Sequence, residues 1–167
     1  MTSLQTIVKQ HQARAAHWAG ESVDWGKRRE KWLSVLRQLM DALRASFKDA
    51  GVPMDQIVDT RHRLTEETLG AYEAPGLEVT IGRDLVAFVP VASLIIGGYG
   101  RVDVIGPRDQ VKLIADRAQS ADEGEPGMPA EECDWVWSAY PDRSRRGGFP
   151  LDEAGLANVL EVVLGGA

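Results

Sequence analysis

The sequence predicts an α+β protein: a long N-terminal helix or helical hairpin, a small antiparallel sheet, and a C-terminal helix packed on that sheet. Two observations predict this class. All eight prolines lie from Pro53 onward, and the apolar spacing changes there from that of a helix to that of a strand. We therefore expect a helical, coiled-coil-like segment over 1–50 and an antiparallel β-domain with its C-terminal helix over 51–167.

The helical segment shows a regular heptad spacing. Thr2 and Gln5 have the spacing of a capping box, so a helix can begin there. Nine of the twelve a and d positions are apolar, which predicts a helix with a narrow apolar seam. These positions are Leu4, Val8, His11, Ala15, Trp18, Ser22, Trp25, Arg29, Trp32, Leu36, Leu39 and Leu43.

The same segment also fits two helices. Gly20 and Gly26 weaken a continuous helix, and Ser22 or Asp24 could cap a new one. The alternatives are one rod over 3–49 or two helices over about 3–19 and 24–49. A continuous rod would be about 70 Å long, whereas a domain of about 120 residues has a radius of gyration near 14 Å. An unbroken helix would therefore have to cover part of its seam with a partner.

The second half of the chain reads as a meander of about five to six strands that could curl into a half-barrel. Short connections between successive strands favour antiparallel pairing. Pro90 argues for an edge position or a β-bulge in its strand. The predicted strands are near 56–64 and at 77–82, 85–92, 101–106, 111–116 and 135–140.

Two loops and one helix complete the predicted architecture. Residues 117–134 are acidic, contain Gly and Pro, and have no apolar period, so we expect a long loop. Residues 141–150 form a shorter, basic loop. Asp152 could cap a C-terminal helix with one apolar face. That face is formed by Leu156, Val159, Leu160, Val163 and Leu164.

The stretch GGYGR at 97–101 resembles a phosphate-binding loop, but a strand pattern follows it. A phosphate loop needs a following helix N-terminus, so we interpret the glycines as hairpin residues that take positive φ. His11 and His17 are six residues apart and lie on different helix faces, which disfavours a metal site. Cys133 lies among carboxylates that disfavour its thiolate.

We therefore expect no enzyme activity, no metal and no cofactor. Ser93 lacks the Gly-x-Ser-x-Gly context of a nucleophile. His62, with Glu66 and Glu67 nearby, is the remaining candidate for acid–base chemistry. Such a cluster is more often a solvated strand edge.

The charge is unevenly distributed along the chain. Residues 1–48 hold nine Lys and Arg against four Asp and Glu, or +5, and residues 49–167 hold ten against twenty-one, or −11. The two parts could attract each other, or two copies could pair. A single cysteine and the absence of a long apolar run predict a cytoplasmic protein without a membrane segment. The Ala- and Arg-rich composition is typical of a GC-rich bacterium.

The leading hypothesis is a non-enzymatic interaction or assembly subunit that binds a protein partner, or a second copy of itself, through the Trp-rich helix. Tryptophan is enriched in interface hot spots. The alternative is that the seam only packs on the chain's own sheet. The expected contact residues are Trp18, Trp25, Arg29, Trp32 and Leu36.

Two other hypotheses remain open. A small acidic inhibitor or immunity-type protein, or a defence accessory protein, would bind a basic partner through its acidic loop. That loop offers Asp122, Glu123, Glu125, Glu131 and Glu132. A nucleic-acid-associated protein would use basic residues beside aromatic ones, although the acidic charge of the β-domain disfavours it. Those residues are Lys27, Arg28, Arg143, Arg145 and Arg146.

Overall fold

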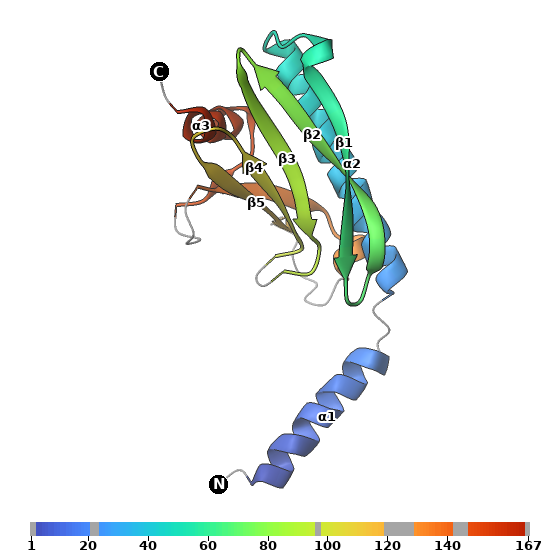
Figure 1. The fold of residues 1–167 in the computed structure, drawn as a ribbon. Helices are drawn as coiled ribbons and strands as arrows, with labels where there is room; N and C mark the ends of the chain where they lie inside the picture. The colour runs from blue at the N-terminus through green and yellow to red at the C-terminus, as the bar shows by residue number, and fades with distance from the viewer. Residues whose placement is uncertain (1–2, 21–23, 96–97, 119–128, 142–146, 166–167) are drawn as a thin grey trace.

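The α+β class is confirmed by a computed structural model, which describes residues 3–20, 24–95, 98–118, 129–141 and 147–165, and only the backbone over 13–20. It contains three α-helices and one seven-stranded antiparallel sheet. The strands are paired in chain order, as expected for a meander. Figure 1 shows the sheet with α2 behind β1 and β2, and with α3 beside the far strands.

Two separate helices form the front of the chain. α1 spans Leu4–Gly20 and α2 spans Trp25–Asp49. Asp24 has an extended backbone, and its side chain accepts a hydrogen bond from the backbone N–H of Lys27, so α2 begins at a proper N-cap. The continuous rod is therefore not formed. The two helices do not pack as a hairpin either, because α1 lies apart from α2 and the sheet (Figure 1).

The sheet has more strands than the sequence pattern indicated. Its strands are β1 Ile57–Glu66, β2 Gly70–Ile81, β3 Asp84–Ala92, β4 Gly100–Ile105, β5 Gln110–Arg117, β6 Trp135–Tyr140 and β7 Phe149–Pro150. β2 begins at Gly70, well before the predicted start at residue 77. The sequence pattern missed this first part because Pro75 interrupts the alternation there. In the structure Pro75 nevertheless pairs with Arg61 of the edge strand β1. The predicted bulge is confirmed by a register shift between Pro90 and Ala92.

Three further elements complete the described part of the fold. Two are 3₁₀ turns and the third is the C-terminal helix, which Asp152 caps through the backbone N–H of Gly155 as predicted. They are η1 Met54–Gln56, η2 Ala130–Glu132 and α3 Glu153–Leu164.

One face of the sheet forms the core with α2 and α3. Trp32 and Leu36 from α2, Phe88 and Leu113 from the sheet, and Val159 from α3 have no exposed area. α2 covers β2, and α3 lies over β3, β4 and β5. The strands contribute mainly valine and leucine on alternate positions, which is how a sheet buries one face.

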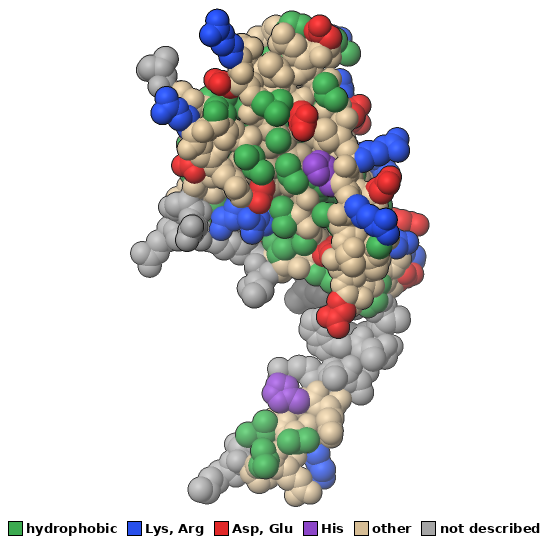
Figure 2. Space-filling model, in the orientation of Figure 1, with side chains coloured by type: hydrophobic (Ala, Val, Ile, Leu, Met, Phe, Trp, Pro, Cys, Tyr) green, Lys and Arg blue, Asp and Glu red, His purple; other side chains and the backbone are tan. Residues whose placement is uncertain are grey.

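The opposite face of the sheet is open. Val58, Glu78, Ala87, Ile105 and Gln110 follow one another across five strands on this face. Figure 2 shows apolar side chains on the face that points to the viewer, with charged side chains mostly around its rim.

Candidate functional site

The predicted tryptophan seam divides between the core and the surface. Trp32 and Leu36 are completely buried in the chain's own core, so neither side chain is available to a partner. Arg29 is half-buried and donates to the carbonyl oxygen of Leu69 at 3.1 Å. Trp25 keeps partial exposure, and the side chain of Trp18 lies outside the described residues. From Trp32 onward, the α2 part of the seam is thus a packing face on the chain's own sheet, which is the alternative that the sequence left open.

Trp32 occupies the centre of an aromatic cluster. Its ring centroid is 6.4 Å from that of Trp135 and 6.1 Å from that of Trp137. Its indole N–H donates to the Tyr72 hydroxyl at 3.0 Å. The backbone of Gly100 lies so close that a Cβ there would come within 2.2 Å of the indole ring.

We predicted that the glycines of GGYGR take positive φ in a hairpin, and the structure shows another reason for two of them. Gly98 and Gly100 do not have positive φ; each allows a close approach, Gly98 to the side chain of Ile114 and Gly100 to Trp32. Residue 97 lies outside the described part. Arg101 binds Asp103 through two hydrogen bonds of 2.7 and 3.0 Å. β4 begins at Gly100, so no helix N-terminus follows these glycines and a phosphate loop is not formed.

The carboxylate of Glu66 links two hairpins through hydrogen bonds, a role that the sequence analysis did not predict. It accepts hydrogen bonds from the Tyr72 hydroxyl and from the backbone N–H groups of Ser93 and Leu94, at 3.0 and 2.9 Å for the two N–H groups. Burial raises the pKa of Tyr72 above its ordinary value, and the hydrogen bond to Glu66 adds to this shift. The end of the β1–β2 hairpin is thereby tied to the end of β3.

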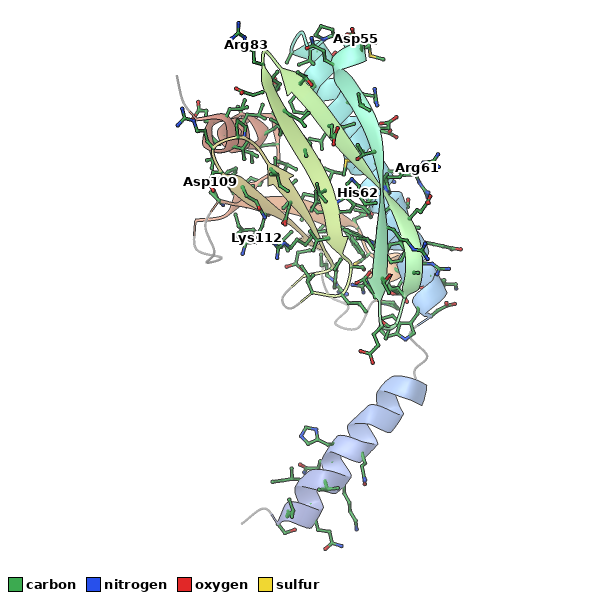
Figure 3. The ribbon with its side chains drawn as sticks, in the orientation of Figure 1. Asp55, Arg61, His62, Arg83, Asp109 and Lys112 are labelled. Atoms are coloured by element: carbon green, nitrogen blue, oxygen red, sulfur yellow. The ribbon has the colours of Figure 1, made fainter. Side chains whose placement is uncertain are left out.

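His62 and Glu66 do not form an acid–base pair. They are four residues apart on one strand, which separates them by about 13 Å. The Nε2 atom of His62 is 2.8 Å from the Thr60 hydroxyl. His62 lies over the sheet, whereas Arg61 points away from its edge (Figure 3). Glu67 is exposed in the connection after β1.

A second polar cluster surrounds Arg28 at the start of α2. Its guanidinium carbon lies 4.8 Å from the ring centre of Tyr99 and 5.2 Å from that of Trp135. Burial lowers the pKa of Arg28, and Glu131 opposes that shift. Its Nε is buried and has no hydrogen-bond partner among the described residues. Arg28 therefore makes a cation–π contact between α2 and the sheet. Because its guanidinium group is held against these rings, it is less accessible to a phosphate group of a nucleic acid.

The acidic and basic loops fall mostly outside the described residues. Glu131 and Glu132 lie in η2, with Glu131 half-buried and Glu132 exposed. Cys133 is buried beside them, and its thiol donates to the Ala130 carbonyl oxygen at 3.3 Å. Lys27 is exposed at the start of α2. The residues of these two predictions that lie outside the description are Asp122, Glu123, Glu125, Arg143, Arg145 and Arg146.

α1 presents an apolar stripe that nothing in the described structure covers. Leu4, Ile7 and Val8 are 78%, 43% and 44% exposed. They lie on one side of the helix, because residues three and four apart share a face. α1 carries Lys9 and Arg14 but no Asp or Glu. Leu4 and Val8 belong to the predicted heptad seam, but neither is among the contact residues that we expected on it.

Comparisons with known proteins give no relative for this fold. No protein-family model matches the chain, and no similar protein was found among curated sequences or solved structures. Among the described residues, no three His, Cys, Asp or Glu side chains are placed to hold a metal ion. Within the same residues, no helix combines the length and apolar character needed to cross a membrane.

Proposed function

We propose that this protein is a non-enzymatic interaction or assembly subunit that binds another protein chain through α1. The carrying observation is the exposed stripe of Leu4, Ile7 and Val8 on a helix that lies apart from the folded body. An isolated helix of this length is marginal in water, so most of its stability has to come from packing. A partner surface that covers the stripe supplies that packing.

The rest of the structure supports separate roles for α1, which binds, and for the folded body, which does not depend on α1. Among the side chains that the structure describes, those of the hydrophobic core lie between Trp32 and Val163, and none comes from residues 4–12 of α1. The side chains that sequence reasoning offered for chemistry have structural partners: His62 contacts Thr60, and the Ser93 hydroxyl donates to the Tyr99 carbonyl oxygen at 3.2 Å. The body thus folds by its own contacts and α1 remains free to bind.

The test compares association with and without the stripe. Leu4→Glu with Val8→Glu places two charges on the stripe. Thr6→Glu with Gln10→Glu places the same charges, at the same spacing, on the opposite side of the helix. Association is measured by light scattering of the purified chain and by capture of proteins from an extract of its own cells. We expect the stripe variant to lose association at least tenfold and the matched control to keep it.

A chain that starts at Asp24 provides the second comparison. It contains every core residue that the structure describes, so its thermal midpoint should equal that of the full chain within a few degrees. It should lack the association that the full chain shows. Identical association of the full chain, this shortened chain and the stripe variant, in both measurements, would refute the proposal.

A further inference from the structure

β1 forms a long free edge of the sheet. It has ten residues, pairs with β2 without a register shift, and has no strand on its other side among the described residues. The edge at β7 is different, because β7 has two residues and one of them is Pro150, which has no N–H to offer a further strand. A long, regular edge of the first kind is a template for pairing with another strand.

Pro75 shows which backbone groups of β1 point outward. It pairs with Arg61, and because it has no N–H the two residues cannot exchange both hydrogen bonds, so they form a non-hydrogen-bonded pair. The Ile57 carbonyl oxygen has the same phase, since it accepts a hydrogen bond from Arg44 of α2 at 3.4 Å. Pair types alternate along an antiparallel ladder. The exposed residues that direct N–H and C=O groups away from β2 are therefore Asp59, Arg61, Arg63 and Thr65.

Neighbouring outward positions of this edge carry opposite charges. The side chain of Asp59 is 78% exposed although it accepts a hydrogen bond from Arg44, and that of Arg61 is 85% exposed beside Glu73 at 4.0 Å. Figure 3 shows Arg61 pointing away from the sheet. When two copies of β1 run antiparallel in a register centred on Thr60, Asp59 of each copy lies opposite Arg61 of the other, and the two Thr60 residues lie opposite each other. Both are favourable cross-strand pairs.

The neighbouring registers set like charges opposite each other. A centre at Asp59 opposes the two Asp59 side chains, and a centre at Arg61 opposes the two Arg61 side chains. A centre at His62 sets Arg61 opposite Arg63. Like charges directly opposite are destabilising, so the charges of β1 favour the register centred on Thr60, which pairs residues 57–63 of both copies.

The position of α2 leaves room for a second copy. Neighbouring strands lie about 4.8 Å apart, so the two β2 strands would lie about 14 Å from each other across the pair of β1 strands. Each α2 packs mainly on its own β2. Because helices that pack together need only about 8–10 Å between their axes, the two α2 helices fit side by side.

We propose that two copies of this chain join through their β1 strands, in an antiparallel pair centred on Thr60 that continues the sheet from one copy into the other. The contact is self-complementary, as a two-fold axis requires. It uses neither α1 nor its stripe, so it does not rest on the proposed function. Association through α1 is what the chain that starts at Asp24 lacks, whereas pairing through β1 is what that chain keeps.

Disulfide formation between full-length chains that carry Thr60→Cys tests this pairing. The two Thr60 residues form a non-hydrogen-bonded pair, whose Cα atoms lie about 4.5 Å apart, within the range that a disulfide spans. The matched control is Val58→Cys, on the same strand and face and 50% exposed. In the proposed register its counterpart lies about 13 Å away along the strands, too far for a disulfide.

Both variants are reduced, brought to equal concentration and reoxidised in a glutathione buffer, and dimers are followed on non-reducing gels. Native Cys133 is only 6% exposed, and the unsubstituted chain reports its reaction. We expect Thr60→Cys to form dimers at least tenfold faster than Val58→Cys, although Val58 is the more exposed position. A rate no higher than that of the control overturns the pairing.

Charge variants in the Thr60→Cys chain test the register. Arg61→Asp should slow dimer formation at least tenfold, because Asp59 then faces a carboxylate of the other copy. Adding Asp59→Arg restores opposite charges and should restore the rate, which a folding defect would not allow. A rate that Arg61→Asp leaves unchanged also overturns the proposed pairing.

The two proposals fail independently. If the Leu4→Glu, Val8→Glu variant loses association but Thr60→Cys forms dimers no faster than its control, the proposed function stands and this inference fails. If Thr60→Cys forms dimers as expected but the Leu4→Glu, Val8→Glu variant keeps all its association, this inference stands and the proposed function fails.

Discussion

At the scale of single residues, small and polar positions decide how the large side chains pack. Trp32 is buried because Gly100 leaves room for its ring and Tyr72 accepts its N–H. Tyr72 in turn donates to Glu66, which holds two backbone N–H groups of another hairpin. One core tryptophan thus depends on a glycine and a chain of hydrogen bonds contributed by separate strands.

Gly100→Ala should destabilise the protein by about 1–3 kcal/mol, the usual cost of an overpacked core. The added Cβ would lie 2.2 Å from a ring carbon of a fully buried indole, which cannot move without disturbing the aromatic cluster. Gly26→Ala is the control, because Gly26 is exposed in the first turn of α2. Its added Cβ would meet only the carboxylate of Asp24, at 3.2 Å, so the change in stability should stay within about 1 kcal/mol. Urea unfolding measures both, and equal effects would contradict the packing argument.

Tyr72→Phe should cost about 1 kcal/mol at neutral pH, because the Trp32 N–H and the Glu66 carboxylate each lose a hydrogen-bond partner. The folded state raises the pKa of Tyr72, so above about pH 10 the unfolded chain releases this proton while the folded chain keeps it. Rising pH then favours unfolding.

The stability difference between the native protein and Tyr72→Phe should consequently be constant below about pH 10 and shrink above it. Urea unfolding at a series of pH values measures it. A difference that stays constant up to pH 11 would show that Tyr72 titrates normally in the folded protein.

At the scale of elements, N-cap residues determine where α2 and α3 begin. Asp24 and Asp152 cap α2 and α3 through backbone N–H groups three residues on, at 3.1 and 2.7 Å. The cap at Asp24 separates α2 from α1 and permits α1 to point away from the sheet.

Asp24→Ala should lower the free energy of unfolding by about 1 kcal/mol, the usual cost of a lost N-cap. Asp49→Ala is the matched control: it removes an exposed carboxylate from the last turn of the same helix, where a negative charge is unfavourable. It should leave stability unchanged or slightly higher. Thermal unfolding compares the two, and equal losses would argue against a capping role for Asp24.

At the scale of the whole molecule, the two faces of the sheet differ in their cover: α2 and α3 pack on one face, and apolar side chains are exposed on the other. The helical face holds the core, and two hollows of about 400 and 340 Å³ lie beside α2 on that face. The open face carries Val58, Leu85, Ile105 and Val136, which are 50%, 49%, 41% and 47% exposed, beside ion pairs such as Arg101 with Asp103. The described side chains of α1 form an uncovered stripe and none of them is in the core, and for this reason α1 is the element that we propose for the interaction.

The sequence by itself determined the class, the meander, the bulge at Pro90 and the capped C-terminal helix, because alternation, short connections and capping residues act over a few neighbouring positions. It left open whether the front helix breaks, since the heptad spacing continues through Gly20 and Gly26 in either case. Only the tertiary structure decided that the Trp32 end of the seam belongs to the core. The heptad grid places Trp25 and Trp32 on the same stripe, and burial depends on which strands come opposite each one. The same holds for Glu66, whose partners Ser93 and Leu94 are 27 and 28 residues away along the chain and are brought to it only by the pairing of the strands.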